Sequence, residues 1–295
     1  MNPARYVVGH AYGGRVAVLL ALLAAVSYGS SDFVAGLMTR RAGPLAVLVV
    51  GEVAGLVLLV VALPVLGGAP AVRPLAWGVL AGAGTTVGTL ALYRGLGVGR
   101  MNVVAPLSGV GAAALPVLAG VAFGERLGVL STVGVVVAVV AIVTVCSGAR
   151  SQIAAGERPA RLGVPEGLVA GLGFAVLFVA LQRAGTGAGL WPLLAAQLSS
   201  LGLLASFGLA TGRRLRPETA QLPGVVAAGL LGVSAVLLFV LATGHGLLSI
   251  VAVVTSLYPA VTVALAIAVL REPVARIQFA GLVAAGTAIV LIVLG

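Results

Sequence analysis

The sequence is dominated by apolar runs about 20 residues long, the length that crosses the hydrocarbon core of a bilayer as an α-helix. We identify ten such runs, at residues 16–38, 44–67, 75–97, 102–122, 128–147, 165–184, 189–210, 223–243, 249–270 and 276–294. Together they leave no room for a water-soluble domain. The sequence therefore predicts an all-α polytopic membrane protein with ten transmembrane helices, placed in the plasma membrane.

The composition excludes several classes of protein. Hydrophobic residues make up 61% of the 295 residues and charged residues only 8%, whereas a soluble domain carries roughly 25% charged residues. The 17 basic residues are all arginine and are scattered between the apolar runs. This pattern is typical of the flanks of membrane spans and not of a nucleic-acid-binding face. We therefore expect a lipid bilayer as the surroundings and no nucleic-acid partner.

The sequence carries no motif for catalysis or for ATP-driven transport. It contains no His-Glu-x-x-His, no Gly-x-Ser-x-Gly and no phosphate-binding loop. Its single cysteine, Cys146, and its two histidines, His10 and His245, are too few and too isolated to predict a metal site. We therefore expect neither an enzyme nor a cofactor, a metal or an ATPase subunit.

The two halves of the sequence resemble each other when one is shifted by 147 residues without a gap. Gly97 then aligns with Gly244, and Glu125 aligns with Glu272, although the chain has only 7 acidic residues. Because each repeat has an odd number of spans, the second repeat enters the membrane from the opposite side. Such inverted repeats of secondary transporters enclose a substrate site near the bilayer midplane. We divide the chain into an N-terminal tail (1–15), a first five-helix repeat (16–147), a central linker (148–164) and a second five-helix repeat (165–295).

Five short motifs occur at matching places in the two halves or near the end of the first span. They are Tyr28-Gly29-Ser30-Ser31-Asp32-Phe33, Val103-Val104-Ala105-Pro106, Phe123-Gly124-Glu125-Arg126-Leu127, Ser256-Leu257-Tyr258-Pro259 and Leu270-Arg271-Glu272-Pro273. Together they resemble EamA-type members of the drug/metabolite transporter superfamily over residues 16–294. The sequence departs from the pattern at Arg271, where the family usually has glycine, and at Ala112, where the repeat predicts a proline.

The resemblance implies ten helices around a central cavity and a small metabolite or drug that is usually exported. It also implies that both termini lie in the cytoplasm. Most of the arginines, however, lie in loops on the opposite side from the termini, and the positive-inside rule then favours termini outside the cytoplasm. The sequence leaves both orientations open.

Two acidic residues, Asp32 and Glu52, lie inside the first and second spans. Inserting an ionisable group there costs at least about 2.5–3.5 kcal/mol of free energy, which indicates that the group has a functional or structural role. With a rise of about 1.5 Å per residue, the two carboxyl groups lie at similar depths on helices joined by a short turn. Two carboxylates close together in a low dielectric cannot both ionise cheaply. We therefore hypothesise a relay that exchanges protons for a substrate.

A structural role is the alternative for both acids. Asp32 would then cap a helix break at Gly29 or form a static ion pair with Arg94, which the parallel third span brings to the same side. Such a pair would hold the carboxylate charged and useless for proton coupling. Neither acid has an acidic counterpart in the second half.

Other polar residues within the spans are candidates for lining a substrate cavity. They are Tyr28, Ser30, Ser31, Thr85, Thr86, Thr89, Tyr93, Asn102, Ser108, Gln182, Trp191, Gln197, Ser199, Ser200, Ser234, Thr255, Ser256 and Tyr258. The alternative for the serines and threonines is helix packing, because their hydroxyl groups often bond to the preceding turn.

Pro106 and Pro259 interrupt the helical hydrogen bonds of the fourth and ninth spans, so we expect hinges there. Glu125 and Glu272 follow the same spans beside arginines and predict a structural, repeated helix-terminating turn.

These features together predict a secondary active transporter that exports a small metabolite or drug by alternating access, with protons as the coupling ion. A lipid or amphiphile flippase, or a non-transporting membrane scaffold, would share the architecture and remains the alternative. A channel would need a selectivity filter or a charged ring, and the sequence contains no sign of either.

Overall fold

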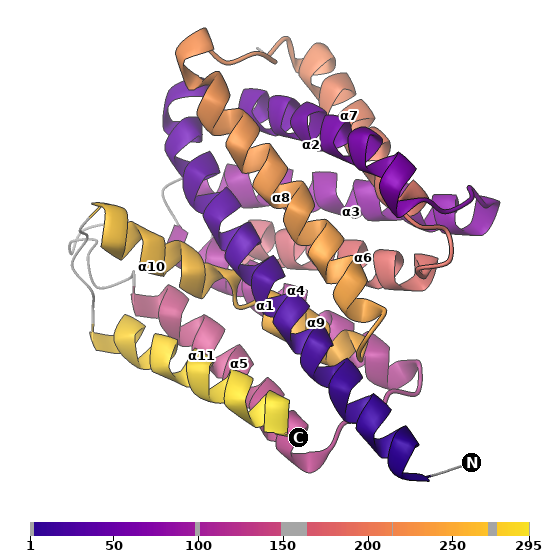
Figure 1. Cartoon of the computed structure of the whole chain (residues 1–295). Coiled ribbons are helices and arrows are strands. Elements are labelled where there is room, and N and C mark those ends of the chain that lie inside the picture. The colour runs from indigo at the N-terminus through magenta and orange to yellow at the C-terminus, as the bar shows by residue number, and fades with distance from the viewer. Residues whose placement is uncertain (1–2, 98–100, 149–163, 214, 271–275, 295) are drawn as a thin grey trace.

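The computed structural model describes residues 3–97, 101–148, 164–213, 215–270 and 276–294, and all regular secondary structure in these ranges is helical. The described residues form twelve helical segments (Figure 1). They are α1 (Pro3–Ala42), α2 (Pro44–Leu66), α3 (Val72–Gly97), α4 (Met101–Ala122), α5 (Val129–Gly148), α6 (Val164–Ala184), α7 (Trp191–Thr211), η3 (Thr219–Gln221), α8 (Leu222–Thr243), α9 (Leu248–Thr255), α10 (Tyr258–Leu270) and α11 (Arg276–Leu294). Most of the predicted linker, residues 149–163, lies outside the described ranges.

Six of the described helices are long and apolar enough to cross a membrane: α1, α2, α3, α6, α7 and α8. Four shorter apolar stretches, Ser108–Ala122, Val129–Thr144, Leu248–Thr262 and Phe279–Ile292, correspond to the remaining predicted spans. Large apolar side chains also cover the outside of the bundle; Val61, for example, is 68% exposed and Leu209 is 75% exposed. Water would penalise such a surface and lipid would not, so the chain is a multi-pass integral membrane protein.

The structure differs from the predicted spans at two places. Helix α1 begins at Pro3, inside the segment predicted as a tail. The predicted ninth span is broken into α9 and α10 at Ser256 and Leu257. Pro259 explains the break, because proline lacks the N–H that a continuing helix needs and its ring clashes with the carbonyl group four residues earlier. Pro259 lies in the first turn of α10, the helical position where proline is well tolerated.

The fourth span shows no comparable interruption. Helix α4 continues from Met101 to Ala122, and Pro106 lies within it. The two predicted hinge residues therefore occupy different backbone environments, one inside a continuous helix and one directly after a helix break.

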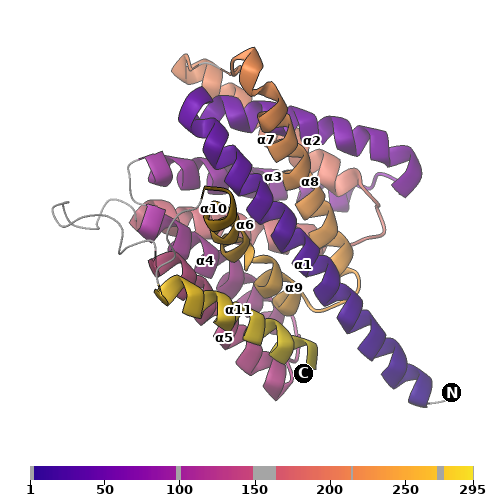
Figure 2. The same ribbon diagram turned by 60° about the vertical axis from the view of Figure 1, so that its left-hand side comes forward.

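Helices of the two halves interleave, and their contacts occur in matched pairs. Helix α3 packs on α6 as α1 packs on α8; α3 contacts α7 as α2 contacts α8; and α4 contacts α6 as α10 contacts α1. In each comparison, one contact becomes the other when every helix is replaced by its equivalent in the other half. Helix α5 lies beside its equivalent, α11, at one edge of the molecule (Figures 1 and 2).

Equivalent helices run antiparallel where they meet. Gly134, near the start of α5, lies against Ile292, near the end of α11. In α2 and α7, Glu52 contacts Ser200 while Gly55 lies against Gln197. The end of α4, at Val117 and Gly120, lies against Ser249 at the start of α9, whereas Gly109, earlier in α4, lies near Pro259. The two halves therefore have opposite directions around a common interface.

Small residues bring the helices of the two halves close together. Gly51 of α2 lies against Gly229 of α8, and a Cβ atom built on Gly51 would lie 3.4 Å from the Cα atom of Gly229. Gly84 and Gly88 of α3 lie against Gly173 of α6 in the same way. Lipid tails are as apolar as leucine side chains, so close packing of small residues is a main source of attraction between membrane helices.

Candidate functional site

A cavity lies between the two halves. Its walls come from α1, α2, α3 and α4 of the first half and from α6, α7, α8 and α10 of the second. Its volume is about 160 Å³. This is below the 300–1,000 Å³ typical of sites for drug-sized molecules, so in this conformation the cavity suits only a small molecule.

The cavity wall is largely apolar, with a limited set of polar side chains. The polar lining residues are Tyr28, Ser31, Asp32, Glu52, Thr85, Thr89, Gln197, Ser200 and Tyr258. All of them were candidates from the sequence. The structure thus gathers polar side chains from five helices, α1, α2, α3, α7 and α10, around one space.

Other predicted candidates lie elsewhere. Thr86, Ser108, Thr255 and Ser256 are buried without lining the cavity. Further candidates that do not line it are Ser30, Gln182, Trp191, Ser199 and Ser234. Arg94 is exposed. The side chains of Tyr93, Asn102 and Pro106, and the whole of Glu272, lie outside what the structure describes, so their predicted roles stay predictions.

Glu52 is held in place by hydrogen bonds from the opposite half of the chain. Ser200 Oγ donates to Glu52 Oε1 at 2.8 Å, and Thr86 Oγ1 lies 3.1 Å from Ser200 Oγ in a second hydrogen bond. Gln197 Nε2 donates to the main-chain oxygen of Glu52 at 2.9 Å. This chain of donors orients the carboxylate and couples α2 to α3 and α7.

Asp32 has no such support. Within the part of the chain that the structure describes, its carboxylate makes no hydrogen bond and no ion pair, although it lines the cavity. The static pair with Arg94 is not formed among these residues. Gly29 lies inside the continuous helix α1, so Asp32 caps no helix break there.

Helix α8 separates the two helices that carry the acids. It packs along both α1 and α2 and lies between them in Figure 1. Ser31 Oγ, next to Asp32, donates to the main-chain oxygen of Ala228 at 2.8 Å. Gly229 faces the backbone of α2. Because α8 presents small residues here, both carboxylates still reach the same cavity.

Tyr28 lines the same cavity as the two carboxylates. Its hydroxyl group is buried and has no hydrogen-bond partner among the described residues. A buried hydroxyl group without a partner is costly, which indicates a place where a bound molecule or water supplies the missing bond.

Aromatic rings form part of the wall. The rings of Tyr28 and Tyr258 have centroids 6.1 Å apart and are tilted by 50°. Phe178 meets Tyr28 edge-on at 6.4 Å and stacks on Phe239 at 4.4 Å. Thr262 Oγ1 donates to the main-chain oxygen of Gly29 at 3.1 Å, which holds α10 against α1. Sequence reasoning missed Phe174 and Phe178, because in an apolar span nothing distinguishes a cavity-lining phenylalanine from a lipid-facing one.

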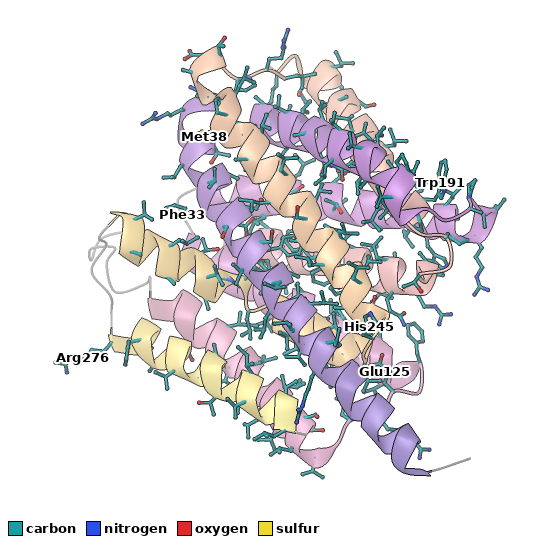
Figure 3. The ribbon with its side chains drawn as sticks, in the orientation of Figure 1. Phe33, Met38, Glu125, Trp191, His245 and Arg276 are labelled. Atoms are coloured by element: carbon teal, nitrogen blue, oxygen red, sulfur yellow. The ribbon has the colours of Figure 1, made fainter. Side chains whose placement is uncertain are left out.

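A third carboxylate, Glu125, lies at one end of the molecule beside the turn that carries His245 (Figure 3). It accepts hydrogen bonds from the main-chain nitrogen atoms of Leu248 (2.7 Å) and Ser249 (3.0 Å). Ser249 Oγ adds a third bond at 2.5 Å. These nitrogen atoms belong to the first turn of α9, where a negative charge is stabilising. Glu125 therefore caps a helix of the other half.

Within the described residues, no group of three or more His, Cys, Asp or Glu residues could hold a metal ion. The acids of the cavity number two, and their neighbours are hydroxyl groups, an amide and aromatic rings. This arrangement suits hydrogen bonding and charge recognition of a small molecule.

Comparison with known proteins identifies the architecture. The sequence profile described as "EamA-like transporter family" matches residues 15–147 and again residues 161–294. Twenty-eight chains of solved structures are similar to this chain. One, described only as "Crystal structure of protein", is 17% identical with a TM-score of 0.76, covering 93% of this chain and 95% of its own. At that identity the likeness shows the fold alone. No curated protein matches the sequence.

Proposed function

Because the chain belongs to the EamA-like transporter family, a family of membrane transporters of the drug/metabolite type, we propose that it is a secondary transporter. It moves a small metabolite or drug through the central cavity by alternating access in the plasma membrane. The direction proposed is export, which rests on the family resemblance alone.

The proposed membrane arrangement is ten spans in two inverted five-helix repeats. The four apolar stretches shorter than a typical span belong to α4, α5, α9–α10 and α11, the fourth and fifth members of each half. They contact one another across the interface. The antiparallel contacts between equivalent helices support the inversion. An inverted pair can exchange its two conformations, so that a cavity open to one side becomes a cavity open to the other.

The observation that carries the proposal is the cavity between the halves with its two acids, Asp32 and Glu52. A non-transporting scaffold gains nothing from a cavity-facing carboxylate that has no partner among the described residues, because such a group costs free energy in a membrane. We assign Asp32 the role of exchanging a proton for the substrate and Glu52 that of a second, oriented carboxylate. The proton and the substrate then compete for one site, which couples their movements.

The break between α9 and α10 is the proposed moving element. Thr255 Oγ1 and Ser256 Oγ are fully buried there without a partner in the described residues. Tyr258 and Pro259 follow directly, and Tyr258 lines the cavity. Interrupted helices within membranes occur where neighbours or a cavity satisfy the backbone. A change of angle at this break would move an aromatic wall of the site.

Alternating access is tested with single cysteines on either side of Glu52. In a Cys146→Ala background, the substitutions Val47→Cys and Leu59→Cys lie about 8 and 11 Å along α2 in opposite directions from Glu52. Both native side chains are buried lining residues. A membrane-impermeant thiol reagent is applied to vesicles of each orientation. We expect the thiols introduced at positions 47 and 59 to react from opposite sides of the membrane.

A matched control is Val57→Cys, because Val57 is 59% exposed on the outer surface of the bundle and its replacement should stay unreactive in lipid. Reaction of both lining cysteines from one side only, or of neither, would contradict alternating access and support a scaffold. Movement of a fluorescent phospholipid between leaflets of the same vesicles would instead support the flippase.

A further inference from the structure

The charged groups on the cavity wall all have the same sign. The chain as a whole has a formal net charge of +10. Yet among the described lining residues the only charged side chains are Asp32 and Glu52, and none is arginine or histidine. Low-dielectric walls concentrate the field of such charges within a cleft. The cavity is therefore a local acidic site in a basic protein.

The rest of the wall is apolar and aromatic. Tyr28, Phe174, Phe178 and Tyr258 contribute rings from α1, α6 and α10, so both halves take part. Aromatic faces attract organic cations through the ring quadrupole, and the attraction grows when the site is shielded from water. A small inorganic cation would instead bind through oxygen ligands alone and would make no use of these rings.

We propose that the cavity binds a monovalent organic cation with an apolar or aromatic body, such as a substituted ammonium ion. This inference rests on the proposed function and names its substrate class. The ammonium group lies near Asp32 and Glu52, and the apolar body contacts the aromatic rings. Binding displaces one proton from the carboxyl pair to water, so the cavity's net charge is unchanged. The exchange is thus one proton for one cation, and no bond other than O–H is broken.

Size-matched probes of different charge test this proposal. Benzyltrimethylammonium, phenylacetate and phenylalanine represent a cation, an anion and a zwitterion with one phenyl ring each. Calorimetric titration of the purified full chain in detergent is carried out at pH 8 and at pH 6. We expect the cation to bind, the other two to show no binding at the same concentrations, and the affinity to fall at pH 6 because protons compete. Titration in two buffers of different ionisation enthalpy should show one proton released per cation.

Three variants locate the binding site. Asp32→Asn and Glu52→Gln should each weaken cation binding at least about tenfold, because each removes a close opposite charge. Glu52→Gln keeps an oxygen that can accept the hydrogen bond from Ser200, and Asp32→Glu should restore binding if the protein is folded. The control is Glu218→Gln, which removes an equal charge from an exposed site and should leave the affinity unchanged.

The proposal is overturned if phenylacetate or phenylalanine binds as tightly as the cation, or if Glu218→Gln weakens binding as much as Asp32→Asn. A further outcome is that the thiols introduced at positions 47 and 59 react from opposite sides in a protein that binds no cation. That result would overturn the substrate class and leave the proposed transporter function in place. Cation binding without that alternation would overturn the transport mechanism and leave the binding site in place.

Discussion

Glu125 and Asp32 are both carboxylates on the first half of the chain, but their surroundings are opposite. Glu125 accepts three hydrogen bonds from the start of α9. Asp32 faces the cavity and has no partner among the described residues. A satisfied carboxylate stabilises one arrangement of helices, whereas an unsatisfied one is available to a proton or a ligand. We therefore expect Glu125 to act on stability and Asp32 to act in the proposed transport.

The largest effect should come from Asp32→Asn. Asparagine has nearly the same shape but cannot exchange a proton, so we expect gradient-driven transport of benzyltrimethylammonium in proteoliposomes to be lost. The melting temperature without substrate should stay the same or rise, because an unpartnered ionisable group is costly inside a membrane. Transport by Asp32→Asn at the wild-type rate would contradict the proposed difference between Asp32 and Glu125.

Glu125→Ala should have the opposite profile. Removing a carboxylate that accepts main-chain hydrogen bonds leaves α9 uncapped, and we expect a loss of about 2–3 kcal/mol of stability. Glu125→Gln should lose roughly half as much, because one side-chain oxygen still accepts. Thermal unfolding in detergent measures both losses. Cation affinity in the folded fraction should be unchanged; a drop of tenfold would mean that Glu125 also acts on the cavity.

Ser200→Ala should give a smaller, mixed effect. It removes the hydroxyl group that donates to Glu52 and accepts from Thr86. We expect about 1–2 kcal/mol less stability and a reduction in cation affinity of a few fold, since Glu52 loses its orientation. Thr86→Val provides the comparison, because it removes only the outer bond of the chain and should affect affinity less. Equal effects of the two variants would contradict the proposed chain of donors.

The smallest effect should come from Tyr28→Phe. The hydroxyl group is buried and unpartnered in the described structure, so its removal should leave the stability unchanged or increase it by about 1 kcal/mol. The aromatic ring remains, and cation affinity should change less than twofold. A clear loss of stability, measured by thermal unfolding, would show that water or another group satisfies the hydroxyl in the membrane.

Several elements agree closely between sequence and structure. The predicted span 44–67 corresponds to α2, Pro44–Leu66, and the predicted span 165–184 to α6, Val164–Ala184. Their boundaries were predictable because a proline or polar residues mark the ends of long apolar runs. The candidate residues Asp32, Glu52, Gln197 and Tyr258 also line one cavity. They were predictable because a polar group inside a span costs free energy and therefore indicates a specific role.

Other features could not be read from the chain. The position of α8 between α1 and α2 has no sequence signal, because helices that are apolar on every side show no preferred buried face. Phe178 became a wall residue only through its packing against Tyr28 and Phe239. The capping of α9 by Glu125 joins residues far apart in the sequence, and a glutamate at a helix end carries no information about such a distant partner.

By itself the sequence determined that the chain is a membrane protein, because its residues are too apolar to form a surface in contact with water. It also determined that the chain is a repeat, because the glutamates and glycines recur at one offset. Only the tertiary structure decided which helices meet, since glycine contacts such as Gly51 with Gly229 depend on the shapes of both surfaces. For the same reason it alone decided which acid has hydrogen-bond partners and which has none among the described residues. Hydrogen-bond partners are set by distances in space and not by positions along the chain.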